Sequence, residues 1–575
     1  MSDLLNKASL VVIHSGYKED TVYSVVPSDG SGDLSFTRAS NGTRINSSGL
    51  VEVCPWNLLE YSEDFSNGVW SIQGSSISSD STTAPNGTTT ADTLIESNTT
   101  DEHNRFQELN IGTGEFTYSI YLKYFNTDYC ALYVFNPSLG GVRYWVNVNT
   151  LTAGTSANIG SGIGTTSLSL ASVGSGWVRA SITFTNPSGV CRFYVANAQS
   201  NGGATTYAGN GTSGVYIWGA QVNIGSTAKP YFPTTDRLNV PRLTYQNGGG
   251  GCPSLLLEKQ STNLVTYSEQ FDNAGWLKFN GAGGSAPVVT PNYALSPDGT
   301  MNADRVQLAR TTQTFSYSEI KQDFGTTGTQ YTVSVYLKSL SGNPTISMAN
   351  DGATFNFLAT LTSEWVRYTA TFTASGTPSA ELILYEQVTS SSLTADFLVW
   401  GFQAEASSYP TSYIPTTSSS ATRVADVCTK TNIGALIGGT SGTVFFDIKT
   451  NPVLSSANYK QFCYYFTSGG AQSYMYLNSA NQLSTNSNWG SFVFSATPLV
   501  ANTRYKIALV YAPNDFALYV NGVSVATASS GTPNNNADIT IGQLAGTEYC
   551  EFVFNQYIHF PSRLTNAELS ALTTI

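Results

Sequence analysis

A long internal repeat constrains the fold of this chain more than any other feature of its sequence. Residues 57–70 read NLLEYSEDFSNGVW, and residues 263–276 read NLVTYSEQFDNAGW. Four further pairs of blocks follow in the same order: FTYSIYLK with YTVSVYLK, WVRASITFT with WVRYTATFT, YIWGAQV with FLVWGFQAE, and YFPTT with YIPTT. Five matching blocks in one order indicate two copies of one module, at residues 57–238 and 263–420.

The repeated blocks alternate apolar and polar side chains. In residues 116–123 and 331–338, aromatic or aliphatic residues alternate with Ser or Thr. A period of two places the apolar side chains on one face of a strand, so these blocks predict half-buried strands. The distance between matching blocks varies along the chain, as expected if loops of different length join fixed strands. We predict that each module is an antiparallel β-sandwich of the jelly-roll type, with roughly eight strands.

A third β-rich region follows the repeat at residues 430–575. It contains a predicted hairpin that turns at Asn521-Gly522, a pair of residues suited to a tight turn, and a capped helical turn near its end. Its main predicted strands lie at residues 442–450, 505–511 and 516–528. The fold class is therefore all-β, with tandem antiparallel sandwiches.

Two shorter segments flank the modules. Residues 1–56 precede the first copy and are predicted to be a separate N-terminal segment. Residues 239–262 are predicted to be a linker, because they contain four consecutive glycines, although SLLLE within them predicts a short buried strand.

Composition excludes several classes of protein. A chain of 575 residues is too long for one hydrophobic core, and its 12% aromatic residues argue against disorder despite only 11% charged residues. A net charge of −12 argues against binding to nucleic acid or to an anionic membrane surface. There is no apolar run of about 18 residues that could span a bilayer. The N-terminus lacks the features of a secretory signal, so we expect none.

The cysteines are few and scattered, without a CxxC pair. An odd, sparse set is a poor disulfide framework and a poor zinc site, so we expect small buried side chains in a protein made in a reducing cytoplasm. The seven are Cys54, Cys130, Cys191, Cys252, Cys428, Cys463 and Cys550.

Two resemblances extend this interpretation. Residues 430–575, with YKIALVYAPNDFALYVNG followed by SRLTNAEL, resemble the laminin-G-like domains of the concanavalin A type. The phrase FTRAS…TRINSSGLVE…NLLEYSEDFSNGVW is similar to one found in structural proteins of bacteriophages that carry carbohydrate-binding-module-like sandwiches. The N-terminal residues also resemble the start of such virion proteins.

These resemblances imply a virion component, made in the cytoplasm of a host bacterium. It would be a tail fibre, a head fibre or an adhesin that binds carbohydrate on the host surface. Residues 1–56 would then dock on other virion proteins, and a homo-oligomer, with a trimer favoured, would add avidity. A purely structural virion component without sugar binding remains an alternative, and a concanavalin A-like glycan hydrolase is a further one.

The sequence offers no catalytic constellation, so we expect no enzyme and no cofactor. The three histidines, His14, His103 and His559, lie in different segments, and no G-x-S-x-G motif is present. Glucanases of the concanavalin A type need paired carboxylates on one strand. Glu548 and Glu551 are the nearest match, and the central Asp of that pattern is missing.

Exposed aromatic rings are the usual platforms for sugars, and six repeated tryptophans are therefore candidates. Because they recur at equivalent places in both copies, we interpret them as framework residues. They are Trp70, Trp177, Trp218, Trp276, Trp365 and Trp400. Ligand contacts are expected where the copies differ, for example in predicted loops at residues 201–214 and 280–297.

The resemblance also implies that a structural calcium ion could be bound through acidic residues of the shared motif. The candidates are Glu63, Asp64, Glu269 and Asp272. In the alternative that we favour, these residues form a hydrogen-bonded turn, in which Glu63 and Glu269 pair with an arginine such as Arg179 or Arg367.

Overall fold

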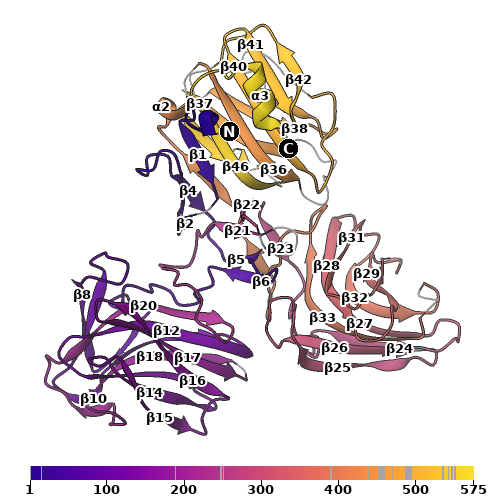
Figure 1. Cartoon of the computed structure of the whole chain (residues 1–575). Coiled ribbons are helices and arrows are strands. Elements are labelled where there is room, and N and C mark those ends of the chain that lie inside the picture. Colours follow the sequence, from indigo (N-terminus) through magenta and orange to yellow (C-terminus); the bar gives the residue numbers. More distant parts are fainter. Residues whose placement is uncertain are drawn as a thin grey trace. The chain divides into compact units, whose positions relative to one another are not determined.

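The computed structural model shows two compact units, which are described separately (Figure 1). One comprises Pro55–Arg237 and Ala294–Asn302, and the other comprises Met1–Cys54, Leu238–Tyr293 and Ala303–Ile575. The structure describes residues 2–575 except 15, 188, 246–248, 250, 356, 389–391, 438–439, 451–459, 469–470, 486–494, 534–536, 542, 545–547 and 550–551. None of the helices in these described ranges is long and apolar enough to cross a membrane.

The first copy of the repeat forms a sandwich of two six-stranded antiparallel sheets, called sandwich 1. Its first sheet has the order β15 (Thr152–Gly160), β14 (Gly140–Asn147), β13 (Tyr129–Asn136), β18 (Val190–Ala198), β11 (Asn104–Asn110), β7 (Ser71–Gln73). Its second sheet has the order β16 (Thr166–Gly174), β17 (Trp177–Asn186), β12 (Gly114–Tyr124), β20 (Gly214–Ile224), β9 (Ala91–Glu96), β8 (Ser75–Thr82). A small pair, β10 (Thr100–Glu102) and β19 (Thr206–Ala208), lies apart from them. Leu132 and Ile182 from the two sheets share one hydrophobic core.

The second copy forms sandwich 2, with two five-stranded sheets. The first has the order β24 (Leu277–Gly281), β27 (Tyr317–Asp323), β32 (Ser379–Tyr385), β29 (Thr345–Asn350), β30 (Leu358–Thr360). The second has the order β25 (Ser285–Ala294), β26 (Ala303–Ala309), β33 (Thr394–Glu405), β28 (Gln330–Ser339), β31 (Val366–Thr373). The predicted sandwich type is confirmed, and both copies contain more than the roughly eight strands expected.

One β-bulge occurs at the same place in both sandwiches. The register between β12 and β20 shifts before Tyr121, and the register between β28 and β33 shifts before Tyr336. Gly219 and Gly401 lie at this point with φ angles of 62° and 65°. A Cβ atom at Gly401 would lie 3.3 Å from both Tyr336 and Tyr413. The positive φ and the close packing explain why both copies have glycine here.

The C-terminal sandwich has two sheets, each of eight strands. One contains β21 (Arg242–Thr244), β22 (Ser254–Leu257), β46 (Phe552–Phe560), β36 (Gly442–Thr450), β40 (Arg504–Ala512), β41 (Asp515–Val520) and β42 (Val523–Ala528), with β1 (Leu10–Ile13) also paired to β46. The other contains β2 (Tyr17–Lys18), β3 (Thr21–Val22), β4 (Leu34–Thr37), β35 (Val427–Lys430), β43 (Asp538–Ile541), β37 (Lys460–Ser468), β38 (Ala471–Leu477) and β39 (Leu483–Thr485).

The remaining elements are short. The pairs are β5 (Gly42–Ile45) with β6 (Val51–Cys54), β23 (Ser261–Asn263) with β34 (Ala421–Arg423), and β44 (Gln543–Leu544) with β45 (Glu548–Tyr549). The helices are α1 (Ser2–Leu5), α2 (Gly434–Ile437) and α3 (Asn566–Thr573). Thr565 and Glu568 form a capping box at the start of α3, which accounts for the helical turn predicted there.

The two flanking segments contribute strands to the C-terminal sandwich. In the N-terminal segment, β1 pairs with β46 from Leu10↔His559 to Ile13↔Gln556, and β4 pairs with β35. In the segment predicted to be a linker, β22 pairs with β46. Figure 1 shows the indigo β1 beside the yellow β46. Both segments contribute buried side chains to this core, so each is part of a folded domain. They are Leu10, Val12, Val22, Leu34 and Phe36 from the first segment and Leu243, Leu255 and Leu257 from the second. Docking through residues 1–56 stays a prediction.

Candidate functional site

The asparagine at the start of each repeat is buried, and its side chain hydrogen-bonds to main-chain groups from separate parts of the module. Asn57 donates from Nδ2 to the carbonyls of Ala220 and Phe232, both at 3.0 Å. Its Oδ1 accepts from the amides of Leu59 and Val222 at 3.1 and 3.2 Å. All four hydrogen-bonding positions of the side chain are therefore used within sandwich 1.

Asn263 makes the same set of contacts in sandwich 2. Its Nδ2 donates to the carbonyls of Phe402 and Ile414 at 3.1 and 2.9 Å. Its Oδ1 accepts from the amides of Val265 and Ala404. The repeated motif therefore ties the entry of each module to its last strand and the chain that follows.

The repeated tryptophans are also part of the framework. The side chains of Trp70 and Trp276 donate to the carbonyls of Tyr61 and Tyr267, each at 3.0 Å. Five of the six repeated tryptophans are buried, and Trp365 is half-buried. This burial fits their interpretation as core residues.

A cluster of shared side chains lies outside the core of sandwich 1. The Arg179 guanidinium lies 5.3 Å from the centroid of the Tyr121 ring and donates to Ser119 Oγ at 2.9 Å. The hydroxyl of Tyr231 donates to Glu63 at 3.2 Å. Burial raises the pKa of Glu63, although its hydrogen bond with Tyr231 partly offsets this effect.

Sandwich 2 repeats this cluster. The Arg367 guanidinium lies 5.5 Å from the Tyr336 centroid and donates to Ser334 Oγ at 2.9 Å. The hydroxyl of Tyr413 donates to Glu269 at 3.0 Å. The predicted pairing of Glu63 with Arg179 is wrong, because Glu63 accepts from Tyr231 and Arg179 donates to Ser119. In both copies a tyrosine hydroxyl donates to the glutamate and the arginine donates to a serine hydroxyl.

The acidic residues of the shared motif do not form a cage for calcium. Asp64 accepts from the amide and hydroxyl of Ser66. Glu63 is held by Tyr231. Within the described ranges, no three His, Cys, Asp or Glu side chains are grouped in a way that could hold a metal ion.

The copies differ on the outer face of the first sheet of each sandwich. Gln107 and Gln322 occupy equivalent positions, which allows the two sheets to be aligned. Gln107 hydrogen-bonds to the amide and the carbonyl of Glu60, and Gln322 hydrogen-bonds in the same way to Thr266. Counting from these glutamines, Phe106 and Lys321 occupy equivalent positions. Their partners across the sheet are Tyr194 and Glu381. An aromatic pair in sandwich 1 is thus replaced by a charged pair in sandwich 2.

We call this region of sandwich 1 the aromatic face. Its residues alternate along β13 and β18 with core residues, so they point away from the core. It consists of Phe106, Tyr129, Tyr133, Phe135, Trp145 and Tyr194, with small alanines between them. The Tyr133 and Tyr194 rings stack at 4.1 Å with an angle of 11°, and Phe106 stacks on Tyr194 at 4.5 Å. Three rings therefore form a continuous ladder across three strands.

Charged groups border the ladder at both ends. The Arg143 guanidinium lies 4.5 Å from the centroid of Tyr133, and Arg192 lies 5.6 Å from that of Phe106. Arg192 also pairs with Glu108 at 2.6 Å. Planar guanidiniums against aromatic rings are favourable, and they leave N–H groups at the edge of the face.

The Glu102 carboxylate accepts three hydrogen bonds from side chains at one edge of this face. It accepts from the Tyr133 hydroxyl at 3.1 Å, from Asn104 Nδ2 at 3.0 Å and from Thr205 Oγ1 at 3.1 Å. Burial, followed by the negative charge of Glu102, raises the pKa of Tyr133. Trp145 Nε1 and Asn104 Oδ1 are buried without a hydrogen-bond partner among the described residues. Both atoms are buried, as are the rings of Tyr133, Tyr194 and Trp145. The half-buried rings of Phe106, Tyr129 and Phe135 are therefore the part of this face that a ligand can reach.

The corresponding face of sandwich 2 has a buried carboxyl pair. Burial raises the pKa of Glu381, and the facing carboxyl of Glu319 raises it further. Ser379 donates to Glu381 at 3.1 Å. Lys321 lies beside this pair, opposite Glu381 in the sheet. The two carboxyl groups retain a proton between them well above the usual range for glutamate.

The predicted binding loops have different outcomes. Residues 201–214 lie beside the aromatic face. There, Thr205 donates a hydrogen bond to Glu102, and the ring centroids of Tyr207 and His103 lie 4.4 Å apart. Residues 280–297 were predicted to be a loop, which is wrong, because most of them belong to β25. The many Ser, Pro and Asn residues of β25 obscured its alternation, since this edge strand has one exposed face.

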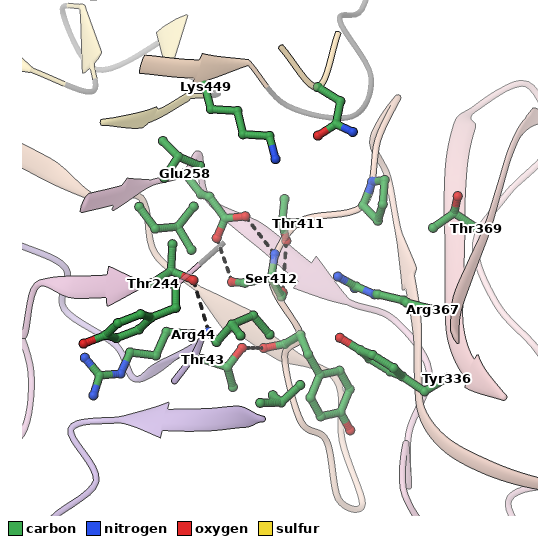
Figure 2. A pocket seen from close by; sticks show the side chains of 18 of the residues that line it. Thr43, Arg44, Thr244, Glu258, Tyr336, Arg367, Thr369, Thr411, Ser412 and Lys449 are labelled. Atoms are coloured by element: carbon green, nitrogen blue, oxygen red, sulfur yellow. Dashed lines mark hydrogen bonds between the residues drawn. The ribbon is translucent and has the colours of Figure 1, made fainter. Parts of the chain in front are cut away.

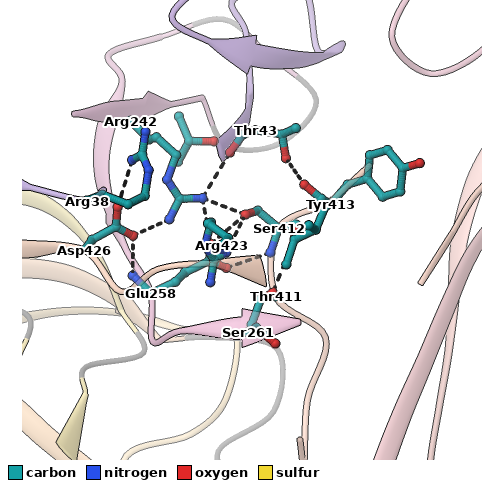
Figure 3. A network of polar contacts seen from close by, with 12 residues as sticks. Arg38, Thr43, Arg242, Glu258, Ser261, Thr411, Ser412, Tyr413, Arg423 and Asp426 are labelled. Atoms are coloured by element: carbon teal, nitrogen blue, oxygen red, sulfur yellow. Dashed lines mark hydrogen bonds and ion pairs between the residues drawn. The ribbon is translucent and has the colours of Figure 1, made fainter. Parts of the chain in front are cut away.

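A buried polar network joins three distant segments (Figure 3). Asp426 accepts from Arg38 at 2.9 Å and also pairs with Arg242. Glu258 pairs with Arg242 and Arg423, each at 2.7 Å. Burial would raise the pKa of Glu258, but Arg423 and Arg242 outweigh it and lower the pKa to about 2. Three guanidiniums thus face two carboxylates.

A cavity of about 480 Å³ lies next to this network (Figure 2). Its wall includes Glu258, the half-buried Arg367 and Lys449, and the rings of Tyr245 and Tyr336. The sequence did not identify this cavity, because its residues come from segments separated by hundreds of positions.

The candidate catalytic residues do not converge in the described structure. His14, His103 and His559 are all buried, and burial lowers the pKa of His14 and of His559 to about 3. Glu551 lies outside the described residues, and the side chain of Glu548 is not described. The prediction that the protein is not an enzyme therefore stays a prediction.

Five cysteines lie in described parts of the chain, and all five are free thiols. Four of them, Cys54, Cys130, Cys191 and Cys428, are buried. Cys252 is exposed. Cys550 lies outside the described residues, and the side chain of Cys463 is not described.

Comparison with known proteins identifies one domain. Residues 431–570 match the family model of the concanavalin A-like lectin/glucanases superfamily, of the Laminin_G_3 type. The matched residues lie in the C-terminal sandwich, and the match agrees with its all-β, lectin-like fold. No curated protein matches the chain.

Solved structures show distant similarity. The CBM40 of the Ruminococcus gnavus IT-sialidase, solved with α2,3-sialyllactose, has 16% identity and a TM-score of 0.21, covering 24% of this chain and 86% of that one. A SAP-like pentraxin from Limulus polyphemus has 16% identity and a TM-score of 0.18, with 23% and 69% covered. Domains LG4-5 of mouse laminin α1 have 10% identity and a TM-score of 0.16, with 50% and 88% covered.

Proposed function

We propose that this protein binds carbohydrate through the aromatic face of sandwich 1. The observation that carries the proposal is the aromatic face, where the half-buried rings of Phe106, Tyr129 and Phe135 border the stacked Tyr194 and Tyr133. A sugar ring stacks its C–H face on an aromatic ring while its hydroxyls take up nearby donors and acceptors.

Comparison of the two copies supports the choice of this face. The repeated residues are committed to internal hydrogen bonds and to the core, as Asn57 and Trp70 are. The aromatic ladder belongs to sandwich 1 alone, since sandwich 2 has Lys321 and Glu381 in its place. A difference that leaves the framework intact is expected where one copy has acquired a ligand.

We further propose that the chain is a virion component, a fibre, adhesin or decoration protein, that displays this face to glycans on a host surface. The phrase shared with phage structural proteins supports this origin, and the lectin-like C-terminal domain is consistent with it. Weak sugar sites gain avidity when several copies act together, which favours a homo-oligomer.

A glycan array probed with the full chain tests the proposed function. We expect binding to a defined set of glycans, weakened about two- to thirteenfold by Phe106→Ala, because loss of an aromatic contact removes about 0.5–1.5 kcal/mol. Tyr133→Phe removes only the hydroxyl that donates to Glu102. The variant should change which glycans are bound, and the protein should still fold.

Lys321→Ala is the matched control, because it changes the equivalent position of sandwich 2. It should leave glycan binding unchanged. Equal loss of binding in Phe106→Ala and Lys321→Ala would contradict the assignment to sandwich 1, and no binding by the oligomeric protein at millimolar sugar would favour a purely structural role.

A further inference from the structure

The cavity beside the polar network has an unusual charge for so acidic a protein. The chain carries a net charge of −12, yet three of the four charged side chains that line this cavity are cations. They are Arg44, Arg367 and Lys449, with Glu258 as the single carboxylate.

Two of these four charges are neutralised by their neighbours. Arg44 forms a bidentate pair with Glu52, at 2.9 and 3.1 Å. Glu258 is paired with Arg242 and Arg423. Neither side chain has its charge available to a ligand.

The other two cations have no carboxylate partner in the described part of the chain. Arg367 donates one hydrogen bond to Ser334 Oγ, and its buried Nε has no acceptor among the described residues. Lys449 forms no ion pair with any described residue. Figure 2 shows both side chains directed toward the cavity from different sides.

The network behind the cavity supplies no further free cation. Arg38, Arg242 and Arg423 face the carboxyl groups of Glu258 and Asp426. A third buried carboxyl group, Glu405, accepts from the amide and the hydroxyl of Thr411 in the cavity wall.

The rest of the wall suits a saccharide better than a bare ion. Tyr245 and Tyr336 present rings, while Thr244, Thr369 and Asn502 present hydroxyl and amide groups. The volume of about 480 Å³ lies within the range of small-molecule sites, roughly 300–1,000 Å³.

We propose that this cavity binds an acidic saccharide, with the sugar carboxylate held by Lys449 and Arg367. The site is separate from the aromatic face, so it does not depend on the function proposed above. Both cations would donate charge-assisted hydrogen bonds, and the tyrosines would contact the ring.

A matched pair of probes tests the proposal. Saturation-transfer NMR on the full chain compares glucuronate oligosaccharides with their glucose counterparts, which lack only the carboxylate. We expect binding of the acidic sugar, reduced at least tenfold by Lys449→Gln or Arg367→Ala and weakened by added salt. Arg179→Ala is the control, because it removes the equivalent arginine of sandwich 1, outside the cavity.

Three results would overturn the proposal. One is equal binding of glucose and glucuronate oligosaccharides. A second is displacement of the sugar by equimolar sulfate, which would indicate a site for a bare anion. A third is unchanged binding in Lys449→Gln, a half-buried position at which the variant is expected to fold. Phe106→Ala should leave glucuronate binding intact. The proposal for the cavity and the proposal for the aromatic face can therefore be tested independently of each other.

Discussion

At the scale of single residues, the carboxyl pair of sandwich 2 shows how burial changes chemistry. Glu319 and Glu381 lie on the face that is aromatic in sandwich 1, and Glu381 is fully buried. The pKa of Glu381 is raised by burial and by Glu319, while Lys321 acts weakly in the opposite direction. The folded protein therefore holds a proton that an unfolded chain releases near pH 4.3.

This proton predicts a pH dependence of stability. Because the folded pKa of Glu381 is raised, its contribution is complete below the unfolded pKa and is lost as pH rises through the folded pKa. We expect the unfolding transition of sandwich 2 to move to lower temperature as pH rises from about 4 through neutrality. Glu381→Gln, which keeps a neutral side chain, should flatten this dependence in calorimetry.

Glu108→Gln is the comparison variant for this measurement. Glu108 is exposed and pairs with Arg192 on sandwich 1, so the variant should leave the transition of sandwich 2 unchanged. A slope of the same size in wild type and in Glu381→Gln would show that another group holds the proton.

The framework residues of the two modules could be predicted from the sequence, but the stacking of the aromatic residues could not. The repeat marked Trp70 and Trp276 as framework residues, and both are buried, because duplication reveals what both copies need. It could not reveal the ladder of Phe106, Tyr133 and Tyr194, since stacking across three strands depends on the register of the sheet.

At the scale of secondary structure, the strand β1 is the clearest departure from expectation. Leu10 and Val12 are fully buried in the core of the C-terminal sandwich. They lie on a strand that pairs with β46, more than five hundred residues away in sequence. The N-terminal strand therefore pairs with one of the last strands of the chain to be synthesised.

Leu10→Ala should destabilise that domain by about 2–5 kcal/mol, the usual cost of removing a buried leucine side chain. The effect should be seen in hydrogen exchange as lost protection in β46 and β36. Protection in β12 of sandwich 1 should stay the same. If β46 kept full protection in Leu10→Ala, the pairing of β1 with β46 would be contradicted.

The predicted strands were mostly confirmed, and two of the strands that were missed share one cause. β15 and β16 consist mainly of Gly, Ala, Ser and Thr, and they form the outer edges of the two sheets of sandwich 1. An edge strand buries little apolar surface, so its sequence lacks the alternation by which strands are recognised.

At the scale of the whole molecule, the two sandwiches share one framework of buried residues and differ in the residues on their outer faces. Duplication provides two sandwiches with the same bulge at Gly219 and Gly401 and the same asparagine connectors. Function is then expected on the surfaces that the copies do not share. The cavity near Lys449 extends this view, because its residues come from segments outside the repeat as well as within it.

The most direct test of the central claim is a crystal structure of the protein with the glycan that it binds best on the array. We predict a sugar ring against the half-buried ring of Phe106, with hydroxyls within hydrogen-bond distance of Arg192 or Glu108 at the border of the face. A sugar bound instead at the shared cluster of sandwich 1, around Arg179 and Tyr121, would contradict the claim that recognition lies where the copies differ.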